Sequence, residues 1–587
     1  MVIEPGGVTE AEPPTGSESS SLSEDSSTPR AERPAASSGG WMRRRAHRWF
    51  RYTLPGLAMA VLFICLSFTP SLLPRSGFLQ GVVCGITGAI GYGLGVVAAG
   101  VWRAFADRDA RSAQRRSWQI FAVVAAVAVL AAILLGRYWQ AQVRDLMDAP
   151  NAAPTAPFVV PVVTAVVFVA LVALSRLLRK GYHGASRLLS RWIGPRAARA
   201  VGWALVVVLT VFLVSGVLLD GGVALVNQTF SVRNGITPEG IVQPTNSLRS
   251  GGPGSLVPWD TLGREGRKFI GTGPRAEEIA AFTGSPAQTP IRAYAGLDSA
   301  DTAERRAQLA VDDLERAGGF ERGTLVVATT TGSGWVDPAS VDTIEYLTGG
   351  DSAIVAMQYS YLPSWISYLV DQKKAREAGR ELFDAVYDHW SKLLPSVRPR
   401  LMVFGESLGS FGGETAFSGE YDLRNRTGGV VFAGPPNFNT LYREFTDGRD
   451  SGSEEVEPIY RDGRTVRFSN NPDVGIDPVD SPWGGTRVLY LEHPSDPIVW
   501  WSPRLILQRP DWLREDRGSD VLGAMQWIPF VTFWQVTADL PFATGVPPGH
   551  GHKYTEEYVD AWAQVLQPAG WSESKAARLR DLIGQGE

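Results

Sequence analysis

The amino-acid sequence predicts an α-helical transmembrane bundle of about five spans, followed by an α/β domain with a mostly parallel sheet. Three observations lead to this prediction. Long apolar stretches are confined to residues 54–226 of the 587-residue chain. After residue 290, β-rich runs alternate with amphipathic helical patterns, which is typical of a parallel sheet covered on both faces. One such run, Leu401–Phe404, leads into G-E-S-L-G at residues 405–409, the pattern of a sharp strand-to-helix turn that displays a serine.

The first predicted segment, residues 1–48, is a disordered cytoplasmic tail. It is rich in Ser, Pro, Glu and Gly and holds almost no large apolar residue before Trp41. A segment of this composition cannot bury enough apolar surface to offset the entropy of folding. It also lacks an apolar stretch near its start, so we do not expect a cleavable signal peptide.

Residues 49–226 form the predicted transmembrane domain. Its apolar stretches approach or exceed the roughly 20 residues that cross a bilayer core. They are nearly free of charge and bounded by Arg and Trp, which favours spans over buried core helices. The second stretch repeats glycine at four-residue spacing, Gly81/Gly85 and Gly91/Gly95, which lets helices approach closely. The stretches are Leu54–Leu73, Phe78–Val101, Trp118–Leu135, Phe158–Leu178 and Ala200–Val226.

The basic residues predict the orientation of these spans. Arginine and lysine cluster before the first stretch, between the second and third, and between the fourth and fifth. The alternate loops hold only Arg75, Arg137 and Arg144. The positive-inside rule therefore places the tail in the cytoplasm, and five spans place everything after about Asn227 outside it. We expect a multi-pass plasma membrane protein with an extracytoplasmic C-terminal domain.

Charge and cysteine content exclude other classes. The formal net charge is −4, so nothing indicates a nucleic-acid partner. Both cysteines, Cys65 and Cys84, lie inside predicted spans. The C-terminal domain therefore has no disulfide framework.

A Gly/Pro-rich connector over residues 227–289 precedes the predicted α/β domain, residues 290–587. Gly251–Gly254 marks a loop within the connector. After it, the alternating patterns predict parallel strands joined by helices. The predicted strands are Ile291–Ala295, Thr324–Thr329, Ser352–Gln358, Arg400–Phe404, Gly429–Ala433 and Arg487–Leu491, and the predicted helices are Ser299–Ala317, Asp371–Leu394 and Thr555–Leu566.

Chain order within this domain predicts a serine-based catalytic triad. Ser407 is the candidate nucleophile, and an acid and then a histidine should follow it along the chain. Asp496 lies a few residues past the strand Arg487–Leu491, where the acid is expected. His493 precedes this acid, so chain order argues against it as the base.

The candidate base lies in the loop Pro548-Gly549-His550-Gly551-His552, before the last predicted helix. We favour His552, because hydrolases with a serine-based triad in this chain order often show a P-G-x-G-H loop. His550 remains the alternative. The two histidines could also chelate a metal, but no further histidine or matching carboxylate motif lies nearby. We therefore expect neither a metal nor a cofactor.

Two places are predicted to supply backbone donors for an oxyanion. Leu408 follows the nucleophile, and its N–H is one expected donor. The second should come from a loop after an earlier strand, and the glycine-containing loop Thr329–Trp335 suits that role. Thr330 or Thr331 is the expected donor there, and a plain glycine turn is the alternative interpretation.

The chain between Asp496 and His552 is long and aromatic. A connection of this length usually has a function or a structure of its own. It is either a packed insertion or a lid or lipid-facing wall over the site, because Trp favours membrane interfaces. Residues 434–485 are a second candidate cap. The aromatic residues are Trp500, Trp501, Trp512, Trp527, Phe530, Phe533, Trp534 and Phe542.

Five segments carry a resemblance to a known family: Leu256–Arg267, Thr331–Pro338, Met357–Trp365, Gly405–Gly409 and Gly549–His552. They resemble the membrane-anchored α/β-hydrolases common in actinobacteria, which have an N-terminal multi-span region and a C-terminal α/β-hydrolase domain. The resemblance covers most of the chain after the tail. It implies an α/β-hydrolase fold with a triad of Ser407, Asp496 and His552, and it fixes no substrate.

These features predict a membrane-anchored serine hydrolase, esterase- or lipase-like, that cleaves ester bonds through an acyl-enzyme on Ser407. The expected substrates are acyl esters of envelope lipids, and membrane lipids are the expected surroundings. An acyltransferase with the same triad is the first alternative. The second is a catalytically inactive membrane scaffold or transport-associated protein.

Overall fold

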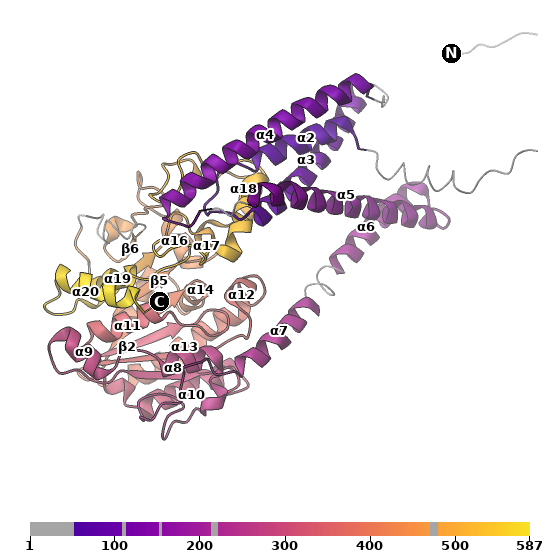
Figure 1. The fold of residues 1–587 in the computed structure, drawn as a ribbon. Helices are drawn as coiled ribbons and strands as arrows, with labels where there is room; N and C mark the ends of the chain where they lie inside the picture. The colour runs from indigo at the N-terminus through magenta and orange to yellow at the C-terminus, as the bar shows by residue number, and fades with distance from the viewer. Residues whose placement is uncertain are drawn as a thin grey trace, which may run out of the picture. The chain divides into compact units, whose positions relative to one another are not determined.

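The computed structural model describes residues 52–107, 113–151, 155–212, 221–469, 479 and 481–586. The described residues from Thr53 onward belong to one unit, in which apolar helices precede a seven-stranded sheet. Figure 1 shows the apolar helices in indigo to purple and the sheet with its helices in magenta to yellow. The predicted tail, residues 1–48, lies outside the described residues.

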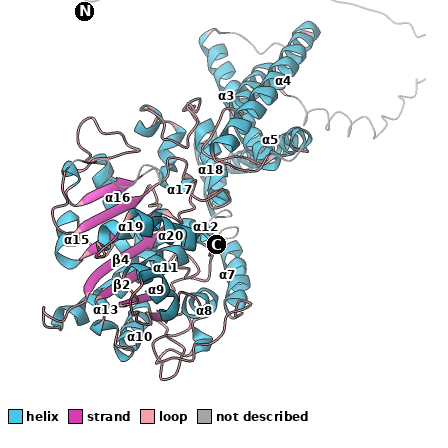
Figure 2. Cartoon of the chain, turned by 60° about the vertical axis from the view of Figure 1, so that its left-hand side comes forward, coloured by secondary structure: helices cyan, strands magenta, loops and turns pink. Residues whose placement is uncertain are grey.

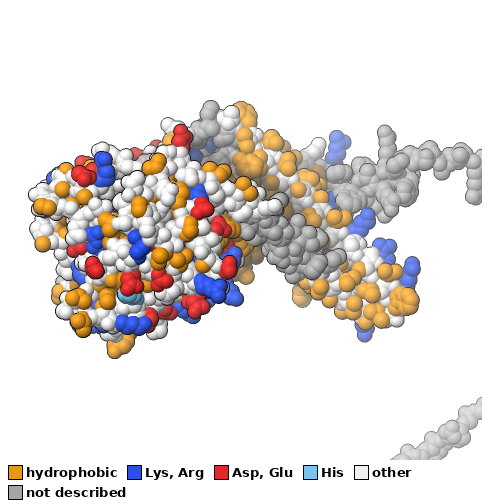
Figure 3. Space-filling view, turned by 90° about the horizontal axis from the view of Figure 1, so that it is seen from below, with side chains coloured by type: hydrophobic (Ala, Val, Ile, Leu, Met, Phe, Trp, Pro, Cys, Tyr) orange, Lys and Arg blue, Asp and Glu red, His pale blue; other side chains and the backbone are white. Residues whose placement is uncertain are grey.

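Three helices in the described part of the chain are long and apolar enough to cross a membrane. They are α3 (Gly77–Phe105), α4 (Arg115–Leu146) and α5 (Ala156–Leu189), and they correspond to the second, third and fourth predicted stretches. Large apolar side chains stay exposed along α4 and α5, as lipid-facing helices require. Figure 3 shows hydrophobic side chains gathered over helices of this region.

The first predicted span, Leu54–Leu73, contains a shorter helix than the sequence predicted. This helix, α2 (Leu54–Leu66), ends where the Ser67 hydroxyl donates to the Ile64 carbonyl at 2.7 Å. Pro70 follows, and a proline cannot continue a helix. The remaining residues form a loop that leads into α3.

The fifth predicted span, Ala200–Val226, is only partly described. It overlaps α6 (Pro195–Phe212) and α7 (Gly221–Asn234), and residues 213–220 lie outside the described residues. The described residues therefore contain three candidate spans, and the predicted number of five is not confirmed.

Glycines bring α3 close to both of its neighbours. A Cβ on Gly81 would lie 2.7 Å from the Val163 Cβ of α5, and one on Gly91 would lie 2.6 Å from the Met59 carbonyl oxygen of α2. Neither distance leaves room for a side chain. The close approach expected from the glycine spacing is therefore present on both sides of α3.

Seven parallel strands form the sheet, in the order β1-β3-β2-β4-β5-β7-β6, and Figure 2 shows them in magenta. The all-parallel sheet confirms the predicted α/β class. Six strands match the predicted ones, and β6 was not predicted. The strands are β1 (Ile291–Ala295), β2 (Thr324–Thr329), β3 (Ser352–Met357), β4 (Arg400–Glu406), β5 (Gly429–Ala433), β6 (Val466–Ser469) and β7 (Arg487–Leu491).

Helices cover both faces of the sheet and enclose two apolar cores. A parallel sheet requires this arrangement, because its strands are apolar on both sides. The first core lies under α10 (Ala303–Arg316), α12 (Ser364–Val370), α13 (Gln372–Lys392), α14 (Leu408–Glu414), α15 (Glu420–Arg426) and α16 (Thr440–Asp447) on one face. The second core lies under α8 (Gly263–Gly271), α9 (Ala276–Thr283), α11 (Pro338–Leu347), α19 (Glu557–Leu566) and α20 (Glu573–Gly584) on the other.

The sheet register brings four loops to one edge. Thr329 at the end of β2 pairs with Gly405 of β4, and Glu406 pairs with Ala433 at the end of β5. Ala433 in turn pairs with Leu491 at the end of β7. The carboxyl ends of β2, β4, β5 and β7 are therefore level, at the edge where open α/β sheets bind their ligands.

The segment predicted as a connector, residues 227–289, is built into this domain. It contains α8 and α9, whose buried Ile270 and Phe282 belong to the second core. The Arg267 guanidinium donates to the carbonyl oxygens of Gly235 at 2.7 Å and Asp260 at 2.8 Å. The glycines and prolines of this segment mark turns between short helices and not an independent linker.

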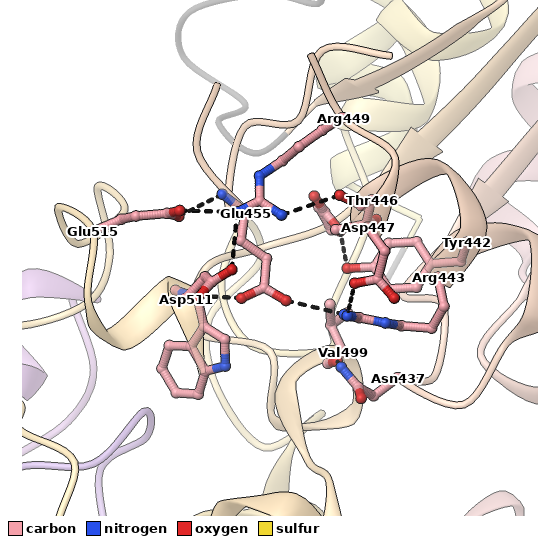
Figure 4. Close-up of polar contacts among 12 residues, drawn as sticks. Asn437, Tyr442, Arg443, Thr446, Asp447, Arg449, Glu455, Val499, Asp511 and Glu515 are labelled. Carbon is pink, nitrogen blue, oxygen red and sulfur yellow. Dashed lines mark hydrogen bonds and ion pairs between the residues drawn. The ribbon is translucent and has the colours of Figure 1, made fainter. Parts of the chain in front are cut away.

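Two insertions, one after β5 and one after β7, pack against each other (Figure 4). Arg449 of the first lies 3.2 Å from Asp511 and 2.9 Å from Glu515 of the second. Trp500 and Trp512 are buried in the first core, so this part of the aromatic insertion is packed and not an open lid. The helices of the second insertion are α17 (Pro497–Trp500) and α18 (Val531–Asp539), with short 3-10 turns at Pro503–Ile506, Asp511–Leu513 and Leu540–Phe542.

Candidate active site

The loop between β4 and α14 holds Ser407 in a strained turn. Its backbone has φ 54° and ψ −123°, a region that non-glycine residues rarely occupy. The Ser407 N–H donates to the Ala433 carbonyl at 2.9 Å and fixes the turn against β5. Only glycine fits two residues before and two residues after Ser407. A Cβ on Gly405 would lie 2.5 Å from the Gly409 carbonyl carbon, and one on Gly409 would lie 2.2 Å from the Thr329 carbonyl oxygen. This is the geometry that the G-x-S-x-G pattern predicts.

Asp496 and His552 are in contact. Asp496 follows β7, and its Oδ2 lies 2.6 Å from His552 Nδ1. The same oxygen accepts the Tyr554 hydroxyl at 2.9 Å, and Oδ1 accepts the Ile498 N–H at 2.8 Å. Asp496 is fully buried, so these donors replace the water that a buried carboxylate needs.

The imidazole of His552 has one nitrogen left for chemistry. Its Nε2 is buried and has no hydrogen-bond partner among the described residues. Gly434 lies against the other side of the ring, where a Cβ would approach Cε1 to 2.3 Å. Ser407 and His552 line the same cavity, although no hydrogen bond joins them within the described residues. Such bonds are often long before a substrate is bound and tighten afterwards.

His550 faces a different carboxylate. Its Nδ1 lies 3.2 Å from Asp520 Oδ2. Asp520 also accepts the Ser495 hydroxyl, and the Ser495 oxygen accepts the Gly551 N–H at 2.8 Å. Of the two candidate bases, the structure therefore brings His552 to Asp496 and leaves His550 as a support of the same loop.

His493 contacts the other side of that loop. Its Nδ1 lies 2.8 Å from the Gly551 carbonyl oxygen, and its Nε2 lies 3.0 Å from Glu557 Oε1. Burial disfavours a charge on this ring, but Glu557, with Asp520 and the Gly551 carbonyl, outweighs burial and raises the pKa of His493 to about 8. A protonated His493 therefore donates to both partners at neutral pH.

The two expected oxyanion donors differ in availability. Leu408 is the first residue of α14, so its N–H has no partner one turn earlier in the helix. The Thr331 N–H already donates to the Trp335 carbonyl at 3.0 Å. This bond removes Thr331 from the expected pair and leaves Thr330, whose hydroxyl donates to the Met357 carbonyl at 2.8 Å and anchors the loop.

The cavity over Ser407 measures about 400 Å³, and its wall combines polar and apolar side chains. Glu406, next to Ser407, accepts the Tyr558 hydroxyl at 2.5 Å. Burial and then the nearby Asp337 charge raise the pKa of Glu406 well above its usual range. The other lining residues are Glu265, Thr331, Ser333, Trp335, Asp337, Pro363, Ser364, Thr544, Lys553 and Tyr554, besides Ser407 and His552.

Sequence reasoning missed several residues of this site. Tyr554 and Gly434, which contact Asp496 and His552, belong to no motif that points to them. Glu406 occupies the variable position of G-x-S-x-G, and its adjacency to Ser407 was the one available signal. No group of three or more His, Cys, Asp or Glu residues that could hold a metal occurs within the described ranges.

Comparison with known proteins gives two family matches. A model described as the alpha/beta-hydrolase family matches residues 291–579, and one described as the alpha/beta-hydrolase family N-terminus matches residues 68–274. No curated protein and no solved structure matches the chain.

The His493–Glu557 pair makes stability depend on pH. The pKa of His493 rises from about 6.5 in the unfolded chain to about 8 in the folded protein, so the pair stabilises fully below pH 6.5 and loses its contribution as pH rises through 8. This difference corresponds to about 2 kcal/mol. In detergent, the thermal midpoint of the wild type should fall between pH 6 and 9 by several degrees more than that of His493→Gln. His389→Gln, outside this network, is the control, and equal slopes for wild type and His493→Gln would contradict the assignment.

Proposed function

Since the chain belongs to an alpha/beta-hydrolase family, we propose that it is a membrane-anchored serine hydrolase that cleaves ester bonds. One observation carries this proposal: the 2.6 Å contact between Asp496 and His552, a ring whose Nε2 has no partner among the described residues and which lines the cavity of the strained Ser407. A serine hydroxyl, an imidazole and a buried carboxylate in this relation are the parts of a nucleophilic triad.

The reaction follows from these positions. His552 Nε2 takes the Ser407 proton as Oγ attacks the ester carbonyl, and Asp496 holds the Nδ1 proton and stabilises the imidazolium. The N–H groups of Leu408 and Thr330 would donate to the oxyanion. His552 then protonates the leaving alcohol, and water attacks the acyl-enzyme by the same path in reverse.

The cavity wall bears on the substrate class. It holds six hydroxyl side chains, three carboxyl groups and Trp335, which offer hydrogen bonds to a polar alcohol. We therefore assign the cavity to the polar half of an acyl ester of an envelope lipid, so that the acyl chain extends away from it. The same wall would suit an acceptor alcohol, and for this reason an acyltransferase is the second candidate.

The catalytic domain is proposed to lie outside the cytoplasm, in a multi-pass plasma membrane protein. Leu73 of the α2–α3 loop and Met147 at the end of α4 are buried in the same core as the catalytic domain. Both belong to the arginine-poor side of the spans. The positive-inside rule assigns that side to the exterior.

A fluorophosphonate probe tests the nucleophile. The wild type should be labelled, and Ser407→Ala should lose labelling, because the probe forms its bond to the activated serine oxygen. Ser574→Ala removes an exposed hydroxyl of α20, outside this cavity, and should keep the wild-type rate. A folded wild type that is not labelled would favour the inactive scaffold.

The same probe separates the two histidines. His552→Ala should slow labelling by about 10²–10⁴-fold, because it removes the general base. His550→Ala should have a much smaller effect, since it removes only a support of the loop. Equal retained rates in both variants would refute the histidine assignment.

Product analysis separates hydrolysis from transfer. With a lipid ester and no added alcohol, we expect free fatty acid to be released by the wild type and not by Ser407→Ala. Addition of a sugar or glycerol acceptor should leave fatty acid as the main product. If the acyl group moves to the acceptor in preference to water, the acyltransferase replaces the hydrolase as the assignment.

Orientation is tested with a reporter that is active only outside the cytoplasm. A fusion after Glu587 should be active, because the C-terminal domain is assigned to the arginine-poor side. A fusion after residue 112, between α3 and α4, should be inactive. The opposite pattern would reverse the proposed topology.

A further inference from the structure

The loop between α2 and α3, residues 67–76, surrounds a carboxylate of the catalytic domain. Asp539, the last residue of α18, accepts the Ser71 hydroxyl at 2.5 Å and the backbone N–H groups of Leu72 and Leu73. The Arg75 guanidinium lies 3.4 Å from its other oxygen. Both charged side chains are almost completely buried.

A second residue of α18 is bound to the same loop. The Gln535 amide donates to the Thr69 carbonyl at 2.9 Å. Gln535 and Asp539 are one helical turn apart, so they lie on one face of α18. Both residues therefore join this face of α18 to the α2–α3 loop, and Figures 1 and 2 show α18 beside the apolar helices.

Arg75 is itself bound to two of the apolar helices. Its guanidinium donates to Gln80 of α3 at 3.1 Å, and its carbonyl accepts the Arg144 guanidinium of α4 at 2.9 Å. Burial raises the pKa of Asp539 to about 6, although Arg75 lies beside it. Removal of one partner from such a buried pair leaves an uncompensated charge and is strongly destabilising.

The residues that follow α18 contact the loop that carries His552. Four residues after Asp539, the Ala543 carbonyl accepts the His552 N–H at 2.8 Å. Leu73 and Ala543 both pack against Gly551, the neighbour of His552. A Cβ on Gly551 would lie 2.6 Å from the Ala543 oxygen and 3.3 Å from Leu73 Cδ2. Leu73 and Ala543 are buried in one core.

We propose that the α2–α3 loop is a positioning element of the candidate active site, in which Arg75 and Asp539 hold α18 and Leu73 supports the backbone of the His552 loop. The role of this loop in activity rests on the proposed function, whereas its effect on the structure does not. Arg75 and Asp539 are positioning residues, since they touch His552 only through residues 540–543 and Leu73.

The test uses the full chain in detergent and has two readouts. Arg75→Ala and Asp539→Asn should each slow fluorophosphonate labelling about 10- to 100-fold through the rate of bond formation, with little change in the concentration of probe at half-maximal rate. Hydrogen exchange in a peptide covering residues 540–552 should rise in both variants, because the His552 N–H loses its fixed partner. Arg137→Ala, which removes an exposed arginine of the same side, should change neither readout.

The double variant Arg75→Gln/Asp539→Asn keeps a polar pair but leaves no buried charge alone. It should recover most of the labelling rate and exchange protection lost in the single variants. Such recovery would not follow if the residues were only distant contributors to stability. Should the single variants fail to fold, the double variant and Leu73→Ala report on the same contact.

The outcomes separate this proposal from the catalytic one. Wild-type rates and wild-type exchange in both single variants would overturn the positioning role while leaving the hydrolase intact. A uniform rise in exchange over β4, β5 and residues 540–552 would also overturn it, because it would indicate general destabilisation. If the wild type is not labelled at all, a rise confined to residues 540–552 would still support the positioning role.

Discussion

The candidate site depends on the buried carboxylate of Asp496, which is stable there because hydrogen-bond donors surround it. Asp496 has no exposed surface, and it contacts an imidazole, a phenol and a backbone N–H. Each donor comes from a segment that the sheet brings to its carboxyl edge. Without the level ends of β5 and β7, the acid and the histidine, 56 residues apart in the chain, would not meet.

The loop that carries His552 is held at every polar atom of its neighbour Gly551. The Gly551 N–H donates to Ser495, and its carbonyl contacts His493. His550 binds Asp520, which also accepts Ser495. The two histidines that do not contact Asp496 therefore hold the loop of the third, and a rigid loop is what a candidate base with an unpartnered nitrogen requires.

Much of the fold was predictable, because strands of a parallel sheet are continuous apolar runs and the serine turn has a local glycine requirement. The positions of Ser407, Asp496 and the His550–His552 loop follow from such local patterns. The sequence left His550 and His552 open as candidates, since the carboxylate that each ring contacts lies elsewhere in the chain. The same holds for Tyr554 and Glu557, whose partners lie far away in the sequence.

Other expectations failed for physical reasons that local patterns do not contain. Pro70 shortened the first apolar stretch, and the apolar faces of α8 and α9 turned a supposed connector into part of the second core. The hydrogen bond between Ser71 and Asp539 joins residues 468 positions apart. During biosynthesis, the first of these partners emerges from the ribosome long before the second is made. The Ser71 hydroxyl therefore lacks this partner while most of the polypeptide is synthesised, and the loop can join the α/β domain through Asp539 only after α18 has been made.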